Sequence, residues 1–73
     1  MNTHEITKAI RNHASTYYNV DGWDILVECF SDEDIRDELL AQGLLTLPEA
    51  LLYFNRKCRL LDDRRKEIAA TEF

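Results

Sequence analysis

The sequence predicts an all-α fold, a small helical bundle of about four helices with a long C-terminal helix. Apolar residues recur at spacings of three and four along most of the chain, which is the period of a helix with one buried face. Three breakers, Gly22, Gly43 and Pro48, divide this pattern into helix-length segments. The 73 residues suffice for one small domain, residues 1–73, whose core must be thin.

The first helix is expected over about residues 4–18. Asn2 is placed to cap it, and Glu5, three residues later, completes the pattern of a capping box. The face expected to be buried carries Ile6, Ala9, Ile10, His13 and Tyr17.

A second helix is expected to begin at Trp23, with Asp21 as its N-cap. Trp23 leads an apolar stripe that continues at Leu26, Val27 and Phe30 with helical spacing. The β-branched and aromatic content of this segment argues for a strand instead, but the spacing favours a helix. Trp23 should be buried against the first and the last helix.

The third helix should start at Asp32, because Ser31 and Asp34 have the spacing of a capping box. Acidic residues crowd its first turn, where the helix dipole favours them. Gly43 should end it as a C-terminal cap. Its buried edge is expected at Ile35, Leu39 and Leu40.

The last helix should span residues 47–70, about 36 Å at 1.5 Å per residue. Thr46 and Glu49 form a capping box, and Pro48 falls in the first turn, where its missing N–H costs nothing. A heptad-like stripe passes over Arg65 and comprises Leu47, Leu51, Phe54, Cys58, Leu61 and Ile68. Because this helix exceeds what so small a domain can cover, its end should fray, project or pack on a second subunit. Candidate self-association residues are Leu51, Phe54 and Leu61.

The charge is distributed unevenly. Nine acidic residues and one basic residue lie between positions 21 and 49, whereas residues 50–73 are mildly basic. This acidic segment is either a solvated surface or a patch for a basic protein partner. Carboxylates spaced along helices can imitate a row of phosphates, so the partner could be a nucleic-acid-binding complex. The candidate partner-binding residues are Asp24, Glu28, Asp32, Asp34, Asp37 and Glu38.

The basic run at residues 64–66 does not predict a nucleic-acid contact. Acidic residues interleave with it, and Asp62 with Lys66 and Arg59 with Asp63 are spaced to pair along one helix. We expect a solvated helix face here and no direct binding of nucleic acid.

Metal and catalytic patterns are weak. Asn19, Asp21, Gly22 and Glu28 match positions 3, 5, 6 and 12 of an EF-hand loop, but Tyr17 replaces the acid at position 1. A turn followed by a helix start explains the same residues.

Cysteine and histidine show no close ligand pair for zinc, and nothing places Cys29 beside His13 as nucleophile and base. We expect no enzyme activity, no cofactor and no metal. Cys29 and Cys58 are expected to be buried free thiols, with a single disulfide between them left open.

No apolar run approaches the ~20 residues of a membrane span, and the N-terminal residues lack the apolar region of a signal peptide. The expected location is the cytoplasm.

The segment GWDILVECFSDEDI resembles short helical proteins encoded by phages and other mobile elements. The resemblance covers about a third of the chain and rests on Gly22, Trp23, Asp24, Glu28, Cys29, Phe30, Asp32 and Ile35. Anti-CRISPR proteins belong to the same broad class of small, acidic, phage-encoded chains. The resemblance implies a non-catalytic inhibitor that acts by binding, and it assigns no functional residue because that class shares no site motif.

Overall fold

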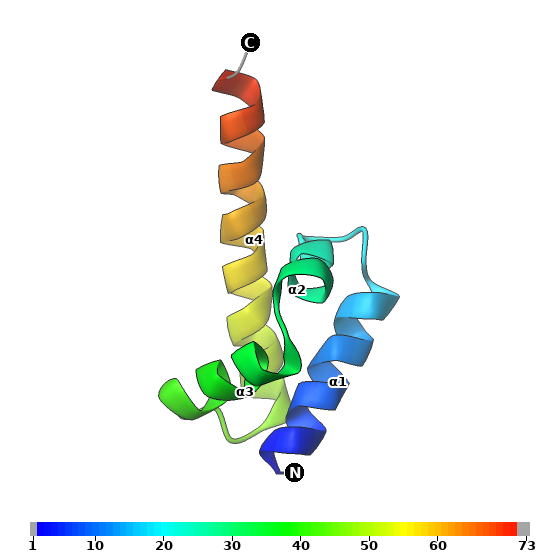
Figure 1. Cartoon of the computed structure of the whole chain (residues 1–73), viewed down its shortest axis with the longest axis vertical. Helices are drawn as coiled ribbons and strands as arrows, with labels where there is room; N and C mark the ends of the chain where they lie inside the picture. The colour runs from blue at the N-terminus through cyan, green and yellow to red at the C-terminus, as the bar shows by residue number, and fades with distance from the viewer. Residues whose placement is uncertain (1, 72–73) are drawn as a thin grey trace.

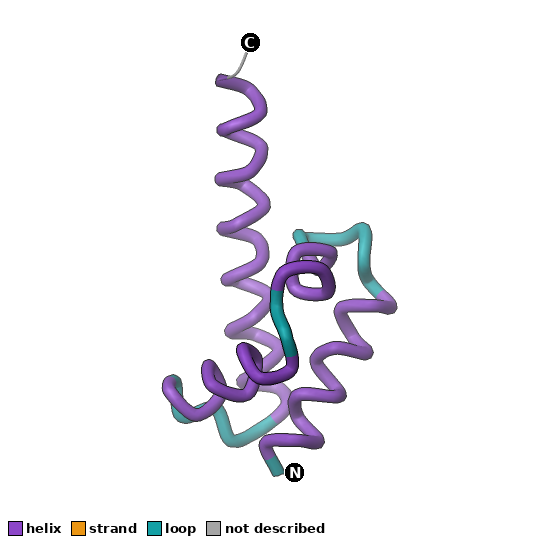
Figure 2. Tube along the Cα trace, in the orientation of Figure 1, coloured by secondary structure: helices purple, strands orange, loops and turns teal. Residues whose placement is uncertain are grey.

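A computed structural model describes residues 2–71 and shows four helices (Figure 1). Their bounds are α1 (Thr3–Thr16), α2 (Trp23–Cys29), α3 (Asp32–Ala41) and α4 (Leu47–Thr71). The described part of the chain contains no β-strand (Figure 2). The all-α prediction and the long C-terminal helix are therefore confirmed, and the segment from Trp23 is a helix rather than a strand.

The helices α1, α2 and α3 gather around the N-terminal half of α4, and the C-terminal half projects beyond them (Figure 1). The molecule is accordingly elongated, with principal extents of 45 × 24 × 19 Å. The projecting end of the long helix matches one of the outcomes expected from its length.

One apolar core joins all four helices, and Trp23 and Phe54 are its largest fully buried side chains. The ring of Trp23 lies edge-on to His13 of α1, with centroids 5.0 Å apart, which confirms its burial against the first helix. Phe54 meets Phe30 edge-on at 6.3 Å. The smaller members of the core are Ile6, Ile10, Ala14, Leu26, Ile35, Leu39, Ala50 and Cys58.

Capping residues set most helix ends. The Asn2 side chain accepts a hydrogen bond from the Glu5 N–H, and Ser31 with Asp34 forms a complete capping box. At the start of α4, the Thr46 hydroxyl accepts from the N–H of Glu49 at 3.4 Å. The three predicted N-caps are confirmed, but of the three predicted capping boxes Ser31 with Asp34 is the one that forms both bonds.

Gly43 ends α3 as predicted. It adopts φ 64°, in the left-handed region, and the N–H groups of Gly43 and Leu44 donate to the carbonyls of Leu40 and Leu39. This pair of bonds is the Schellman arrangement, which places Leu44 against the core.

Some predictions near the turns were wrong. Asp21 does not cap α2: the N-cap is Gly22 at φ 78°, and Asp21, at φ 50°, pairs instead with Arg59. Leu40 is 66% exposed, because α3 turns only Ile35 and Leu39 into the core. Tyr17 follows the end of α1, is 48% exposed and lies against His13, with the two rings tilted by 40°.

Gly22 brings α2 against α4 at close range. A Cβ added there would lie 2.5 Å from the Cys58 carbonyl oxygen and 2.9 Å from the Cβ of Asp62. The absence of a side chain therefore lets the two backbones touch, and the positive φ independently favours glycine.

Candidate protein-interaction surface

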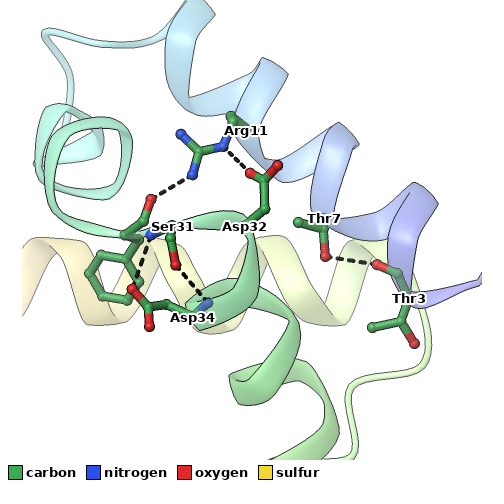
Figure 3. A network of polar contacts seen from close by, with 7 residues as sticks. Thr3, Thr7, Arg11, Ser31, Asp32 and Asp34 are labelled. Atoms are coloured by element: carbon green, nitrogen blue, oxygen red, sulfur yellow. Dashed lines mark hydrogen bonds and ion pairs between the residues drawn. The ribbon is translucent and has the colours of Figure 1, made fainter.

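The first turns of α3 present a cluster of exposed carboxylates. Its members, which we call the α3 acidic surface, are Asp32, Glu33, Asp34 and Asp37. The capping box builds this surface, because the Ser31 N–H donates to Asp34 at 3.0 Å and the Asp34 N–H donates to the Ser31 hydroxyl at 3.1 Å (Figure 3). The bond from Ser31 keeps the pKa of Asp34 below its ordinary value, so this carboxylate stays ionised.

Arg11 of α1 fixes the start of α3 from the side. Its Nε donates to Asp32 at 2.5 Å and its Nη2 to the Phe30 carbonyl at 2.5 Å (Figure 3). One guanidinium thus holds the turn between α2 and α3, although the Asp32 side chain remains 71% exposed. Sequence reasoning missed Arg11, because no spacing rule links residues 21 positions apart.

Two of the candidate partner-binding residues do not face solvent freely. The Asp24 side chain is 21% exposed and accepts from Arg65 of α4 at 2.8 Å. The Glu38 side chain, 28% exposed, accepts from the Tyr53 hydroxyl and from Lys57 at 3.2 Å. The Tyr53 bond, and secondarily Lys57, lower the pKa of Glu38. Both carboxylates tie α2 or α3 to α4.

The Glu28 side chain is exposed but takes part in a hydrogen bond within the chain. It accepts a hydrogen bond from the hydroxyl of Tyr18, which raises the pKa of that phenol. Asp37, in contrast, is exposed at the end of the α3 acidic surface. The structure thus brings Asp32, Asp34 and Asp37 together on α3 and directs Asp24 and Glu38 toward α4.

A second charged cluster joins α2 to α4. The Asp62 side chain is 13% exposed and accepts from Arg65 at 2.5 Å and from Lys66 at 3.1 Å, while Arg65 also reaches Asp24. The hydrogen bonds from Lys66 and then Arg65 lower the pKa of Asp62. The predicted pair of Asp62 with Lys66 is confirmed, whereas Arg59 pairs with Asp21 at 3.8 Å rather than with Asp63.

The two cysteine thiols differ in their exposure to solvent. Cys58 is buried, and burial raises the pKa of its thiol to about 11. Cys29 is exposed, so the prediction that it is buried was wrong: at the end of α2, only Trp23 and Leu26 of this helix are fully buried. Both cysteines are free.

In residues 2–71 no three His, Cys, Asp or Glu side chains are grouped so as to hold a metal ion. In the segment that resembles an EF-hand loop, Asp21 pairs with Arg59 and Glu28 binds Tyr18. Nor does any helix of the described chain have the length and apolar content to cross a membrane.

The projecting part of α4 exposes apolar side chains. Leu60 is 70% exposed and Ile68 is 55% exposed. Leu61, half-buried, joins Leu60 in a shallow groove whose other lining residues are Lys57, Asp63, Arg64 and Glu67.

The candidate self-association residues occupy different environments. Phe54 is fully buried within its own chain, and Leu51 packs against the same core. Of the three, Leu61 alone lines the exposed groove. Sequence periodicity placed the three residues on one stripe of α4. It could not distinguish the part of the stripe that the other helices cover from the part that they leave exposed.

The chain matches no protein-family model, no curated protein and no solved structure with which it was compared.

Proposed function

We propose that this chain is a small, non-catalytic interaction protein of the cytoplasm that binds a basic protein through its α3 acidic surface. The observation that carries the proposal is the set of four exposed carboxylates within six residues, accompanied only by Arg36 in that stretch. Such a density of one charge attracts a basic partner and repels nucleic acid.

The surface is also well anchored. The capping box and Arg11 fix the first turn of α3, so the carboxylates are held on a stable helix rather than on a loop. A fixed array loses little entropy on binding, which favours recognition of a complementary row of basic side chains. Carboxylates spaced along a helix resemble phosphates, which suits a partner that normally binds nucleic acid.

The resemblance of residues 22–35 to phage-encoded proteins supports a more specific role. On this proposal the chain is a phage-encoded inhibitor that occupies the nucleic-acid-binding surface of a CRISPR-type defence complex. Its action is then competitive with DNA or RNA, and it requires no cofactor and no catalytic residue.

The inhibitory role is tested with a panel of purified CRISPR effector complexes and labelled target DNA in a mobility-shift assay. The unmodified protein should prevent DNA binding by at least one complex. The double variant Glu33→Lys, Asp37→Lys should not, since neither residue takes part in the capping box or contacts Arg11. Asp63→Lys, an exposed charge reversal on α4, is the matched control and should inhibit like the unmodified protein.

If no complex in the panel is inhibited, the anti-defence role is contradicted. The broader proposal is tested by capturing host proteins with the unmodified chain and with each variant, and comparing the proteins that are bound. Host proteins that bind through α3 should be lost with the Glu33→Lys, Asp37→Lys variant and retained with Asp63→Lys. Their binding should also weaken as salt rises, because exposed charges are screened over about 10 Å at 0.1 M. Captured proteins that bind both variants equally would contradict a role for the α3 acidic surface.

The alternative function is a self-associating structural or regulatory module without an inhibitory role. The exposed apolar side chains of the projecting half of α4 favour it specifically.

A further inference from the structure

The outward face of α3 continues past its carboxylates. Glu33, Asp37 and Leu40 follow one another at spacings of four and three, so they lie on one side of the helix. All three are exposed, because the opposite side turns Ile35 and Leu39 into the core. The α3 acidic surface therefore runs directly into an apolar side chain.

Two leucines make this end of the surface apolar. Leu40 is 66% exposed, and Leu45, just beyond the Gly43 cap, is 76% exposed. Figure 1 shows the end of α3 and the turn after it at the edge of the bundle, away from α1 and α2. We call Leu40 and Leu45 the leucine end of α3. Its side chains are open to a partner that approaches α3.

A partner that covers the carboxylates of α3 also reaches the leucine end. The rise of 1.5 Å per residue puts Leu40 about 4.5 Å beyond Asp37 and about 10 Å beyond Glu33 along the helix axis. A specific protein interface covers roughly 800 Å² on each partner, which is roughly 30 Å across. A footprint of that size centred on Glu33 and Asp37 includes Leu40.

This overlap determines which chemistry the partner needs. Burying an exposed leucine against apolar atoms favours binding, whereas burying it against a charged side chain deprives that charge of water. Over residues 32–37, four acidic residues outnumber the single basic residue, Arg36, so the rest of the surface attracts positive charge. The complementary surface thus carries basic side chains beside an apolar one.

We propose that the partner of the α3 acidic surface is an amphipathic basic protein segment, whose apolar side chain packs on the leucine end while its basic side chains meet Glu33 and Asp37. This inference rests on the proposed function and adds what makes it selective. The carboxylates attract any basic segment, whereas the leucine end favours those that also carry an apolar side chain.

Two synthetic helical peptides test the proposal. Both carry the same row of lysines, and they differ only in having leucine or glutamine beside that row, two residues of similar helix propensity. Fluorescence anisotropy measures the affinity of each peptide for the unmodified chain. The leucine peptide should bind about tenfold more tightly, because its apolar side chains become buried. This ratio should persist as salt rises, while the affinity for both peptides falls.

The leucine end is tested with the double variant Leu40→Gln, Leu45→Gln. It should bind the two peptides equally. Val20→Gln, Ile68→Gln is the matched control and should keep the tenfold preference, because it removes two side chains, 47% and 55% exposed, that lie in the turn after α1 and at the end of α4, far from α3 (Figure 1). All four substituted side chains are exposed, so thermal unfolding should be the same for the three proteins.

Failure of this inference and failure of the proposed function give different results. Equal binding of the two peptides by the unmodified chain, or a Leu40→Gln, Leu45→Gln variant that keeps the preference, would overturn the inference and leave the acidic surface as the binding site. A Glu33→Lys, Asp37→Lys variant that binds both peptides as tightly as the unmodified chain would overturn the proposed function. An unmodified chain that binds neither peptide would overturn both.

Discussion

The two halves of α4 share one apolar period but have different surroundings. Over residues 47–58 the stripe is covered, and Ala50, Phe54 and Cys58 are inaccessible to solvent. Over residues 59–71 the same period continues through Leu61 to Ile68, yet Ile68 is 55% exposed. Asp62 and Arg65 occupy the intervening positions. Asp62 forms an ion pair with Lys66, and Arg65 forms one with Asp24.

The difference shows that helical periodicity predicts which face of a helix prefers burial, but not which molecule buries it. The first half of α4 is covered because α1, α2 and α3 pack their buried apolar residues against it in one small core. The second half extends past them and is held by the charged cluster at its start and by the ion pair of Arg59 with Asp21. A covered half and an uncovered half should respond differently to the same kind of substitution.

The largest difference is expected between Phe54→Ala and Ile68→Ala. Phe54→Ala leaves a cavity in the core and should cost about 3–5 kcal/mol of unfolding free energy. Ile68→Ala removes an exposed side chain and should change stability by no more than about 0.5 kcal/mol. Urea unfolding of dilute protein measures both, and a similar loss for the two variants would show that residues 59–71 belong to the core.

Gly22→Ala should break the approach of α2 to the covered half. The new Cβ collides with the Cys58 carbonyl and is strained at φ 78°, so we expect a loss of about 2–4 kcal/mol. Gly43→Ala is the control, because it has a similar φ of 64° and open space around it, and should lose about 1–2 kcal/mol from strain alone. Thermal unfolding compares them; equal losses would mean that α2 and α4 can separate at this point without cost.

The charged cluster at the boundary between the two halves should make stability depend on acid pH. Because the pKa of Asp62 is lower in the folded chain, its contribution is present above the unfolded value of about 3.9 and is lost as pH falls through the folded value. Asp62→Asn should therefore lower the urea midpoint at neutral pH, and its difference from the unmodified protein should shrink below about pH 4. Asp63→Asn, the exposed neighbour, is the control. A constant difference at all pH values would contradict the lowered pKa.

The smallest expected effect is a difference in reactivity between the two cysteine thiols, and it involves no change in stability. Cys29 should react with a disulfide reagent near pH 8, whereas Cys58 should react only after unfolding, since burial raises its pKa to about 11 and blocks access. The measurement is the number of thiols that react with and without denaturant. Repeating it with Cys29→Ser shows which cysteine each reactive thiol belongs to. Rapid reaction of both thiols in the native protein would show that the covered half of α4 opens readily.

Much of this fold follows from local rules. Asn2, Ser31, Thr46 and Gly43 fix helix ends through bonds within a few residues, and such short-range signals are readable in a sequence. The turn before α2 was misread because Asp21 is a good N-cap by residue type, but the close approach of Gly22 to α4 leaves that position to glycine. At this turn, the tertiary contact of Gly22 with α4 overrides the local preference for Asp21 as the N-cap.

The candidate surface was less readable than the fold. The sequence shows that acids are concentrated between positions 21 and 49, but not which of them the chain uses internally. Glu38 meets Tyr53 and Lys57, and Asp24 meets Arg65, across 15 to 41 residues of sequence. Such pairs depend on how helices pack, and periodicity within one helix carries no information about them.

Amide hydrogen exchange along α4, measured at low and at high protein concentration, tests most directly whether its two halves serve different purposes. In dilute protein the amides of residues 50–58 should be strongly protected and those of residues 62–71 weakly protected, because only the first set lies in the core. If the chain self-associates through the projecting part of α4, raising the concentration should increase protection in residues 62–71 and leave residues 50–58 unchanged. Uniform protection along the whole helix would contradict the division of α4 into a core half and a half that the rest of the chain leaves largely uncovered.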